Sequence, residues 1–369
     1  MKKNKKSKIQ TPIYVVIGTR AQFIKVAPML RKMLDQKVQY ELIYTAQHQE
    51  TIDEILNVYK LPKPDKVMYK KDEANTRKKF LAWFLSILYQ CIFRFKKWLP
   101  KKGYLLTHGD TFTTWLAALM GKLAGCKVCH LESGMRSFNL LKPFPEEISR
   151  IITFLLTDIY FCSYKEAVDN LKRFKGKKIN LKMNIMYDGV MYALKHSSKK
   201  KFLFQNKKYA IVSIHRYENI YTSRLTDIII PMLKKISKQI ELVITLHPTT
   251  RERLKSQKLF KILNKNKRII LHTRFGFLDW INVCSKAVFV ITDGGSNQQE
   301  LSYLGTPTIL FRTETESKEG IGENVILSKF NPKIINNFVT NYKRYKRCLL
   351  KTSHSPSQLV INFLKKEIE

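Results

Sequence analysis

Residues 13–18, Ile-Tyr-Val-Val-Ile-Gly, form a short apolar run that leads into a helix-like segment at 23–36. A buried strand followed closely by a helix is typical of a parallel sheet that helices cover on both faces. The same alternation continues along the chain, with apolar runs at 40–46, 103–110, 126–132 and 159–164. These runs predict one doubly wound α/β domain over residues 13–195.

The alternation restarts after a polar, basic stretch around residues 195–208. Apolar runs follow at 209–216, 241–248, 268–274, 287–295 and 307–312. They predict a second domain at 205–350, so we expect two doubly wound Rossmann-like domains that face each other across a cleft. We interpret residues 1–12 as a basic tail. Residues 351–369 are predicted to form a C-terminal helix, which either closes the second domain or crosses back over the first.

The chain is strongly basic, with 67 Lys and Arg against 29 Asp and Glu and a formal net charge of +38. This charge favours an anionic partner, namely nucleic acid, an anionic membrane surface or a phosphorylated substrate. No nucleic-acid recognition motif accompanies the charge, so nucleic acid is not expected as a partner. No apolar stretch precedes the first strand, and the six cysteines are scattered as packing residues of a reducing compartment would be. We therefore expect a cytoplasmic protein.

The few carboxylates of the chain include a group at the predicted strand ends and helix starts. They are Asp110, Glu132, Glu146 and Glu147, in the segments THGDTFTTW, HLESGMRS and PFPEEISR. Open α/β sheets place ligand groups at the carboxyl ends of their strands, and carboxylates gathered in a positive field indicate acid/base chemistry on an anionic substrate. The same residues could instead serve as helix caps. Spacing alone leaves both roles open.

Seven motifs occur in one order along the chain: GTRAQFIKVAPML, TAQHQE, HGDT, HLESGMRS, PFPEEISR, SIHRYEN and TDGG…QQE…LG.P. Over residues 13–330 this series resembles the UDP-N-acetylglucosamine 2-epimerase family. The resemblance implies a GT-B-type fold, shared with many nucleotide-sugar glycosyltransferases, with UDP in the cleft between the domains. It implies a UDP-N-acetylhexosamine as the substrate, and no cofactor and no metal. A homodimer is a further expectation.

The resemblance also implies roles for single residues. Matched to the family's motifs, Asp110, Glu132 and Glu146 are the catalytic carboxylates. Arg150 lies one helical turn beyond Glu146 and would hold one of these carboxylates ionised. His215 follows the first strand of the second domain and matches a family histidine near the phosphates, where it is expected to take part in catalysis.

The remaining assignments concern the nucleotide. The residues matched to the diphosphate and to the ribose are Arg20, Lys25, Gly294, Gly295, Ser296 and Glu300. The glycine pair and Ser296 open a helix whose amides can receive phosphate, and Glu300 matches a glutamate that hydrogen-bonds the ribose hydroxyls.

The implied reaction inverts C2 by eliminating UDP, forming a 2-acetamidoglycal and adding UDP back. We expect a non-hydrolysing 2-epimerase that supplies a ManNAc-type sugar for surface polysaccharide. A membrane-associated glycosyltransferase with a lipid-linked acceptor is the second hypothesis. It is favoured by residues 313–319, which lack the arginine of the family's TxERPE motif, and by the apolar segment at 80–99. The third hypothesis is a hydrolysing epimerase, and the fourth is a nucleotide-sugar-binding protein without activity.

Residues 80–93, FLAWFLSILYQCIF, are apolar nearly all round and have basic residues on both sides. The run is shorter than the about 20 residues that span a bilayer. Trp83 and Trp98, with Arg94, Lys96 and Lys97, suit an interfacial helix on anionic lipid. Residues 80–99 therefore predict a peripheral contact with the inner face of the membrane, with a fully buried core helix as the alternative.

Overall fold

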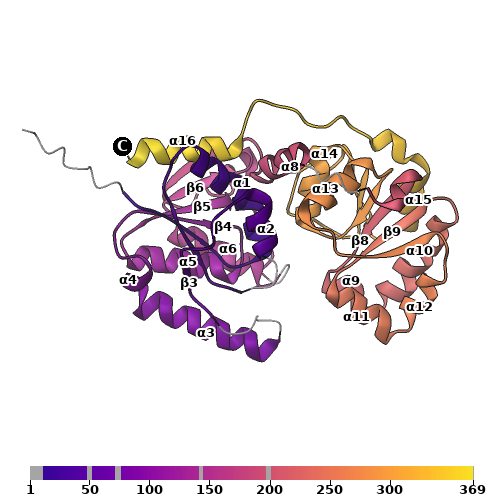
Figure 1. Cartoon of the computed structure of the whole chain (residues 1–369), viewed down its shortest axis with the longest axis horizontal. Coiled ribbons are helices and arrows are strands. Elements are labelled where there is room, and N and C mark those ends of the chain that lie inside the picture. The colour runs from indigo at the N-terminus through magenta and orange to yellow at the C-terminus, as the bar shows by residue number, and fades with distance from the viewer. Residues whose placement is uncertain (1–10, 48–51, 71–75, 141–143, 197–200, 369) are drawn as a thin grey trace, which may run out of the picture. The chain divides into compact units, whose positions relative to one another are not determined.

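The computed structural model describes residues 11–47, 52–70, 76–140, 144–196 and 201–368 (Figure 1). The chain divides into unit 1, Met1–Gly189 with His354–Glu369, and unit 2, Val190–Ser353. The basic tail predicted at 1–12 lies outside the described residues except for its last two positions.

Unit 1 folds around a parallel sheet, which has seven strands within the described residues, in the order β3-β2-β1-β4-β5-β6-β7. The strands are β1 (Ile13–Ile17), β2 (Glu41–Tyr44), β3 (Lys66–Val67), β4 (Tyr104–His108), β5 (Lys127–Ser133), β6 (Ile159–Cys162) and β7 (Lys177–Asn180). The order reverses between β1 and β4, and in doubly wound sheets the crevice at this point is where ligands bind.

Helices connect these parallel strands. They are α1 (Arg20–Asp35), α2 (Ile52–Tyr59), α3 (Arg77–Phe93), α4 (Phe95–Trp98), α5 (Phe112–Leu123), α6 (Glu146–Leu156), α7 (Lys165–Asp169) and α8 (Met186–Lys195), which carries the boundary with unit 2. The side chain of Thr19 caps the first turn of α1, and Gln22 in that turn donates a hydrogen bond to the carbonyl of His108 at 2.7 Å. The start of α1 is thereby fixed to the end of β4.

The C-terminal helix α16 (Pro356–Ile368) returns to unit 1, where it packs against α1 (Figure 1). Buried Asp188 anchors its start, because the carboxylate accepts hydrogen bonds from Ser355 Oγ and Ser357 N, both at 2.8 Å. Lys32 on α1 donates to the same carboxylate at 2.8 Å. Of the two placements that the sequence left open, the structure has the helix on the first domain.

Unit 2 repeats the architecture with a parallel sheet of six strands, counted within the described residues, in the order β10-β9-β8-β11-β12-β13. The strands are β8 (Tyr209–Ser213), β9 (Glu241–Leu246), β10 (Ile269–Thr273), β11 (Val290–Thr292), β12 (Thr308–Leu310) and β13 (Val325–Leu327). The order reverses between β8 and β11. Two Rossmann-like domains were predicted, and this prediction is confirmed.

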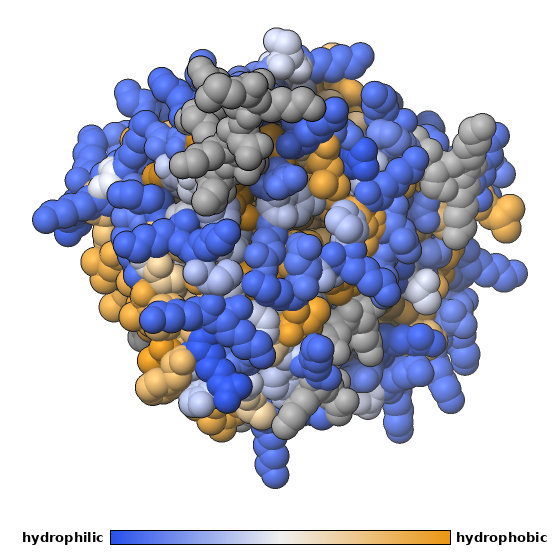
Figure 2. All heavy atoms as spheres, turned by 60° about the vertical axis from the view of Figure 1, so that its left-hand side comes forward, coloured by the Kyte–Doolittle hydropathy of each residue, from blue (hydrophilic) through white to orange (hydrophobic). Residues whose placement is uncertain are grey.

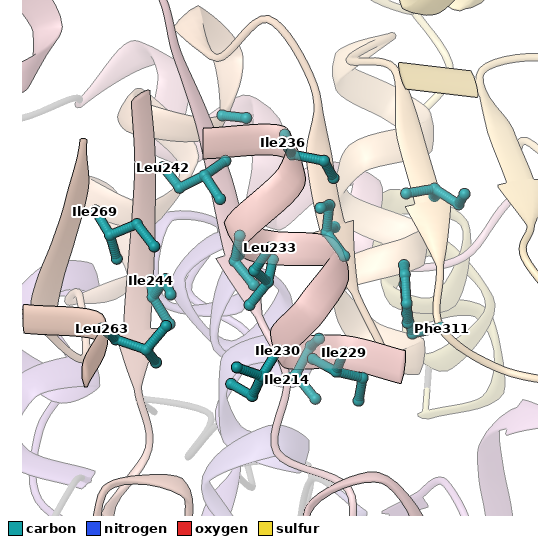
Figure 3. Close-up of a cluster of buried hydrophobic side chains, with 14 of the residues drawn as sticks. Ile214, Ile229, Ile230, Leu233, Ile236, Leu242, Ile244, Leu263, Ile269 and Phe311 are labelled. Carbon is teal, nitrogen blue, oxygen red and sulfur yellow. The ribbon is translucent and has the colours of Figure 1, made fainter. Parts of the chain in front are cut away.

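The helical elements of unit 2 are η1 (Leu203–Asn206), α9 (Tyr217–Ile220), η2 (Leu225–Ile229), α10 (Ile230–Ser237), α11 (Pro248–Ser256), α12 (Leu259–Asn264), α13 (Phe277–Lys286), α14 (Gly295–Leu304), α15 (Pro332–Asn341) and η3 (Tyr342–Tyr345). Ile230, Leu233 and Ile236 on α10 pack towards Leu242 and Ile244 on β9 (Figure 3). Burying each of these side chains contributes about 1.5–3 kcal/mol, which makes this layer a main source of the unit's stability.

Helix α3 differs from both interpretations of residues 80–99. Trp83 and Trp98 are buried, and the Trp83 indole donates to the carbonyl of Thr45 at 2.9 Å, so the assignment of these two tryptophans to a lipid interface was wrong. The alternative of a fully buried helix was wrong as well, because Leu81, Leu85 and other apolar residues of α3 are exposed. Among the described residues, no helix is long and apolar enough to cross a membrane.

Candidate functional site

Three predicted site residues of unit 1, the catalytic carboxylates Asp110 and Glu132 and the diphosphate residue Lys25, come from neighbouring strand ends. Lys25 lies on α1, which follows β1, Asp110 lies two residues beyond β4, and Glu132 is the second-last residue of β5. These strands are adjacent and parallel, in the order β1, β4, β5. Their carboxyl ends therefore meet at one edge of the sheet, at the point where the strand order reverses.

Glu132 occupies an irregular position in β5. The register between β5 and β6 shifts between Leu131 and Ser133, and Glu132 has a φ of +60°, in the left-handed region. This conformation costs a residue with a Cβ roughly 1–2 kcal/mol, and bulges of this kind re-aim a side chain next to active sites. The bulge turns the Glu132 carboxylate towards Lys25, whose Nζ lies 2.6 Å and 2.8 Å from its two oxygens.

Two further residues contact the Glu132 carboxylate. Asn184 Nδ2 donates to Oε1 at 2.5 Å, and His108 Nε2 lies 3.4 Å from Oε2. Burial lowers the pKa of His108 to about 3, although the Glu132 carboxylate acts in the opposite direction. His108 is therefore neutral at physiological pH and presents an N–H or a lone pair, but no positive charge, to Glu132.

His130 supports the loop after β4 from the neighbouring strand. Its Nε2 lies 2.7 Å from the carbonyl oxygen of Gly109, and its Nδ1 lies 2.8 Å from Ser133 Oγ. Burial lowers its pKa to about 4, so the ring is neutral, and a neutral ring that donates from Nε2 accepts the Ser133 hydroxyl at Nδ1. This pair of contacts fixes the backbone directly before Asp110.

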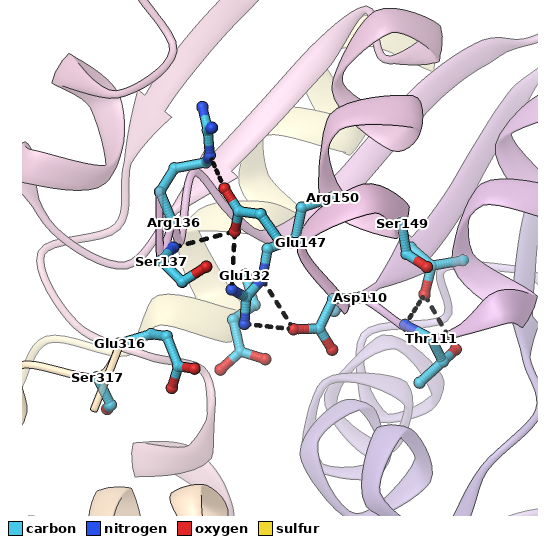
Figure 4. Close-up of polar contacts among 12 residues, drawn as sticks. Asp110, Thr111, Glu132, Arg136, Ser137, Glu147, Ser149, Arg150, Glu316 and Ser317 are labelled. Carbon is cyan, nitrogen blue, oxygen red and sulfur yellow. Dashed lines mark hydrogen bonds and ion pairs between the residues drawn. The ribbon is translucent and has the colours of Figure 1, made fainter. Parts of the chain in front are cut away.

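Arg150 joins two carboxylates (Figure 4). Its Nη2 lies 2.7 Å from Asp110 Oδ2, and its Nη1 lies 3.1 Å from Glu147 Oε2. Arg150 was expected to hold one of the predicted carboxylates ionised, and in the structure it forms an ion pair with Asp110. Glu146, the third predicted carboxylate, opens α6 and is half-buried.

Glu147 received no catalytic role from the sequence, yet it is fully buried in the centre of this network. Its carboxylate accepts hydrogen bonds from Arg136, from Arg150 and from the backbone N–H of Ser137 (Figure 4). Burial alone would raise the pKa of Glu147, but these three donors outweigh it and lower the pKa. Glu147 is thus a permanent anion that positions Arg150, and through it Asp110.

Arg20 is the first residue of α1 and is buried. Its Nη2 lies 2.8 Å from Glu54 Oε2 on α2, so the structure pairs it with a carboxylate that the sequence did not single out. Its assignment to the diphosphate stays a prediction.

The predicted residues of unit 2 gather at the ends of β8 and β11, again where the strand order reverses. Fully buried Asp293 organises them: its carboxylate accepts the backbone N–H of His215 at 3.0 Å and that of Arg216 at 2.9 Å. Asn219 Nδ2 donates to it at 2.9 Å, and His215 Nδ1 lies 3.2 Å from it. Burial lowers the pKa of His215.

His215 also packs between a ring and a glycine. Its ring stacks on that of His247, with centroids 4.3 Å apart. A Cβ at Gly294 would lie 3.2 Å from His215 Cε1 and 2.7 Å from Asn297 Oδ1, whereas a Cβ at Gly295 would meet nothing within 4 Å. Gly294 is therefore required by close packing, and Gly295 leaves open space in front of the N-terminus of α14.

Ser296 lies in the first turn of α14, and Glu300 lies one turn further on. Glu300 is buried, and its Oε2 accepts a hydrogen bond from Trp280 Nε1 at 2.7 Å. The Trp280 contact fixes the orientation of the carboxylate that the sequence assigned to the ribose.

The segment 313–319, which departs from the family's motif, is tied to α14 by Gln298. Gln298 Oε1 accepts from Thr315 Oγ1 at 2.7 Å, and its Nε2 donates to the carbonyl of Ser317 at 3.0 Å. Buried Arg312 lies 3.1 Å from Glu316. A guanidinium is therefore present next to this segment although the motif's own arginine is missing.

A family model described as UDP-N-acetylglucosamine 2-epimerase matches residues 32–356. The chain belongs to the UDP-N-acetylglucosamine 2-epimerase family. The family is one of enzymes, and membership confirms the predicted resemblance.

Known members of the family are similar over most of their length. A UDP-N-acetylglucosamine 2-epimerase of Methanococcus maripaludis is 29% identical, over 89% of this chain and 90% of its own. A UDP-2,3-diacetamido-2,3-dideoxy-D-glucuronate 2-epimerase of Pseudomonas aeruginosa is also 29% identical, over 88% of this chain and 90% of its own. Family members thus differ in the sugar for which they are named.

The crystal structure of the Methanocaldococcus jannaschii UDP-GlcNAc 2-epimerase, in complex with UDP-GlcNAc and UDP, has this fold. It is 25% identical and superposes with a TM-score of 0.82, over 96% of this chain and 99% of its own. The likeness confirms the predicted GT-B-type fold, with its two Rossmann-like domains.

Four residues of the site escaped the sequence interpretation. They are His108, His130, Asn184 and Asp293. Three of them stand inside the motifs HGDT, HLESGMRS and TDGG, so their place in these motifs was a usable signal. Asn184 contacts Glu132 from 52 residues away, and no local pattern could have indicated it.

Proposed function

We propose that this protein is a non-hydrolysing 2-epimerase of a UDP-N-acetylhexosamine. The observation that carries the proposal is the set of carboxylates at one sheet edge of unit 1, each held by basic or amide donors. Asp110 is bound by Arg150, and Glu132 is bound by Lys25 and Asn184. Family membership supports an epimerase over a glycosyltransferase.

The reaction balances without an oxidant or a reductant. A base removes the proton at C2, the bond between C1 and the UDP oxygen breaks, and UDP leaves with the electron pair while C1 and C2 form a double bond. In the reverse direction, the UDP oxygen attacks C1 and an acid returns a proton to C2 on the opposite face. The enzyme must therefore offer acid/base groups on both sides of the ring and positive groups for the departing diphosphate.

We assign the acid/base roles to Asp110, Glu132 and Glu146. The partners of the first two support this assignment, because they hold each carboxylate in a fixed position at the carboxyl ends of the strands. Neutral His108 beside Glu132 brings no second positive charge to the site, next to that of Lys25, when Glu132 accepts a proton and later returns it.

We assign diphosphate binding to Arg20, Lys25 and His215 and to the N-terminus of α14, with Gly294, Gly295 and Ser296. Two properties support the role of α14: its first amides follow an open glycine position, and a helix N-terminus attracts anions. Asp293 fixes the backbone of His215 against this helix, which supports a catalytic part for the histidine. Glu300, oriented by Trp280, is assigned to the ribose hydroxyls.

For the sugar we propose UDP-GlcNAc, with UDP-ManNAc as the product, for use in surface polysaccharide. The Methanococcus and Methanocaldococcus relatives are named for this substrate. The Pseudomonas relative is named for a UDP-diacetamido uronate. This nucleotide-sugar is therefore the alternative substrate to test beside UDP-GlcNAc.

The test is product analysis after the purified protein has been incubated with UDP-GlcNAc alone. We expect UDP-ManNAc, with no free sugar, separated by anion-exchange chromatography. Free N-acetylmannosamine and UDP would indicate a hydrolysing epimerase instead. Consumption that requires a glycosyl acceptor would indicate a transferase.

We propose the cytoplasm as the place of this reaction, at the inner face of the membrane. All six cysteines are free thiols, as is usual in a reducing compartment.

A further inference from the structure

Helix α3 has two distinct apolar faces. One face packs into unit 1 through fully buried Trp83, Ile87 and Cys91. Between the two faces, the ring of Phe84 contacts those of Phe112 and Trp115 on α5, with centroids 5.5 Å and 6.0 Å apart. The helix is thus firmly attached to the domain by one side.

The other face is apolar and exposed. Its residues, here called the α3 face, are Leu81 (55% exposed), Leu85 (54%), Tyr89 (50%), Ile92 (36%) and Phe93 (70%). They recur at the three- and four-residue spacing of one side of a helix. Soluble proteins rarely expose a contiguous row of large apolar residues without a binding role. Figure 2 turns forward the side of Figure 1 that carries α3 and α4, and hydrophobic atoms gather at its left among largely hydrophilic ones.

The surroundings of the α3 face are basic. The sequence contains no Asp or Glu between residues 74 and 109. The exposed basic residues next to α3 and α4 in this stretch are Lys78, Lys79, Arg94, Lys96, Lys97, Lys101 and Lys102. A hollow of about 670 Å³ on one flank of α3 is lined by Ala82, Ser86 and Gln90 of the helix. Its charged lining residues are Lys66, Lys70 and Lys97 with one acid, Asp65, and Lys66 is paired with Glu41.

We propose that the α3 face docks on an anionic membrane surface, with α3 lying in the plane of the interface. The exposed apolar row would enter the boundary between headgroups and acyl chains, and the basic residues at both ends of the helix would lie over anionic headgroups. Helix α3 has 17 residues, so at 1.5 Å per residue it is about 25 Å long, short of a bilayer core of about 30 Å. The proposal goes beyond the epimerase reaction and does not depend on it.

Charge favours a lipid surface over a second copy of this chain. A twofold interface places the same surface of both subunits in contact. The basic residues around one α3 face would then meet those around the other, with no acidic residue of the 74–109 stretch to neutralise them. An anionic lipid surface attracts these basic residues instead. Each basic residue near the surface raises the affinity for the membrane by about 5-fold.

The experiment is flotation of the full-length protein with vesicles of phosphatidylcholine mixed with phosphatidylglycerol, and with vesicles of phosphatidylcholine alone. We expect the protein to float with the anionic vesicles, less so at high salt, and poorly with the neutral ones. Leu85→Ser together with Phe93→Ser should abolish flotation without changing the melting temperature or the epimerase activity, because both side chains are already exposed. Leu155→Ser with Leu203→Ser is the matched control, since these side chains are 70% and 91% exposed outside α3.

A second pair of variants separates charge from apolar contact. Lys78→Gln with Lys96→Gln should weaken the affinity for anionic vesicles by about 25-fold, from two lysines at about 5-fold each. Lys333→Gln with Lys343→Gln removes the same charge from unit 2 and should have little effect.

Three results would overturn the proposal. The first is a wild-type protein that does not float with anionic vesicles. The second is an α3 variant that floats as well as the wild type. The third is light scattering that shows a wild-type dimer converted to a monomer by Leu85→Ser and Phe93→Ser, because the α3 face would then be covered by a second copy.

Discussion

Lys25 and Glu132 form a buried ion pair in which Nζ lies 2.6 Å from Oε1 and 2.8 Å from Oε2, with side chains 8% and 7% exposed. The pair links the first helix of unit 1 to the bulge at the end of β5. Each charge is tolerated in the interior because the other is present, so the two residues contribute to stability as a unit.

Replacing Lys25 by Met should therefore leave an uncompensated buried carboxylate and cost about 3–5 kcal/mol of unfolding free energy. Replacing both Lys25 and Glu132 by Met should recover much of this loss, because no buried charge remains unpaired, but it should not recover activity. Urea unfolding of the two single variants and the double variant measures the coupling. Additive losses would contradict a coupled pair.

Asp110→Asn and Glu132→Gln should each lower turnover by roughly 10²–10⁴-fold, because each removes one acid/base group. UDP affinity should change little, since neither residue is assigned to the nucleotide. Steady-state kinetics measures the turnover of each variant, and calorimetric titration measures its affinity for UDP. A folded variant that no longer binds UDP would refute the assigned role.

The glycine pair before α14 gives a matched comparison. Gly294→Ala should lower the melting temperature, because its Cβ would lie 2.7 Å from Asn297 Oδ1 and 3.2 Å from His215. Gly295→Ala meets nothing within 4 Å in the protein and should leave the melting temperature unchanged, yet it should weaken UDP binding if phosphate approaches this position. Thermal melts and UDP titrations separate the effects; unaltered UDP affinity in Gly295→Ala would argue against phosphate there.

Acidification should destabilise unit 1 through its buried histidines. The pKa of His130 is lowered from 6.5 to about 4 by burial, so the unfolded chain takes up a proton in this interval and the folded protein does not. The stability is complete above pH 6.5 and is lost as the pH falls towards 4, by about 1.4 kcal/mol per pH unit for this residue. In His130→Gln, the free energy of unfolding should depend less steeply on pH by this amount. Urea unfolding at several pH values measures the difference. Parallel slopes for the two proteins would rule this linkage out.

Much of the fold could be predicted because long apolar strands alternate with helices. The strands missed were β3, β7 and β13. β3 has only two residues, β7 reads Lys-Lys-Ile-Asn, and all three lie at sheet edges, where little burial is required. Such strands carry no long apolar run, so their pairing is determined by the neighbouring strand rather than by their own sequence.

The site was predictable only in part. Asp110 and Glu132 could be found because parallel strands carry ligand groups at their carboxyl ends. The positive φ of Glu132, the contact with Asn184 and the burial of Glu147 depend on tertiary packing, so sequence spacing could not indicate them. In α3, apolar residues occupy every side of the helix, so periodicity could not distinguish the buried face of Trp83 from the exposed face of Leu85.

The most direct test of the proposed chemistry is proton NMR of UDP-GlcNAc incubated with the wild-type protein in D₂O, without cofactor, metal or acceptor. Elimination and re-addition of UDP require the C2 proton to leave and a solvent proton to return, so we expect deuterium at C2 of both UDP-GlcNAc and UDP-ManNAc as they interconvert. Asp110→Asn should slow this exchange and the interconversion together. Interconversion with the C2 proton retained, or no exchange in a folded protein that binds UDP, would contradict the account.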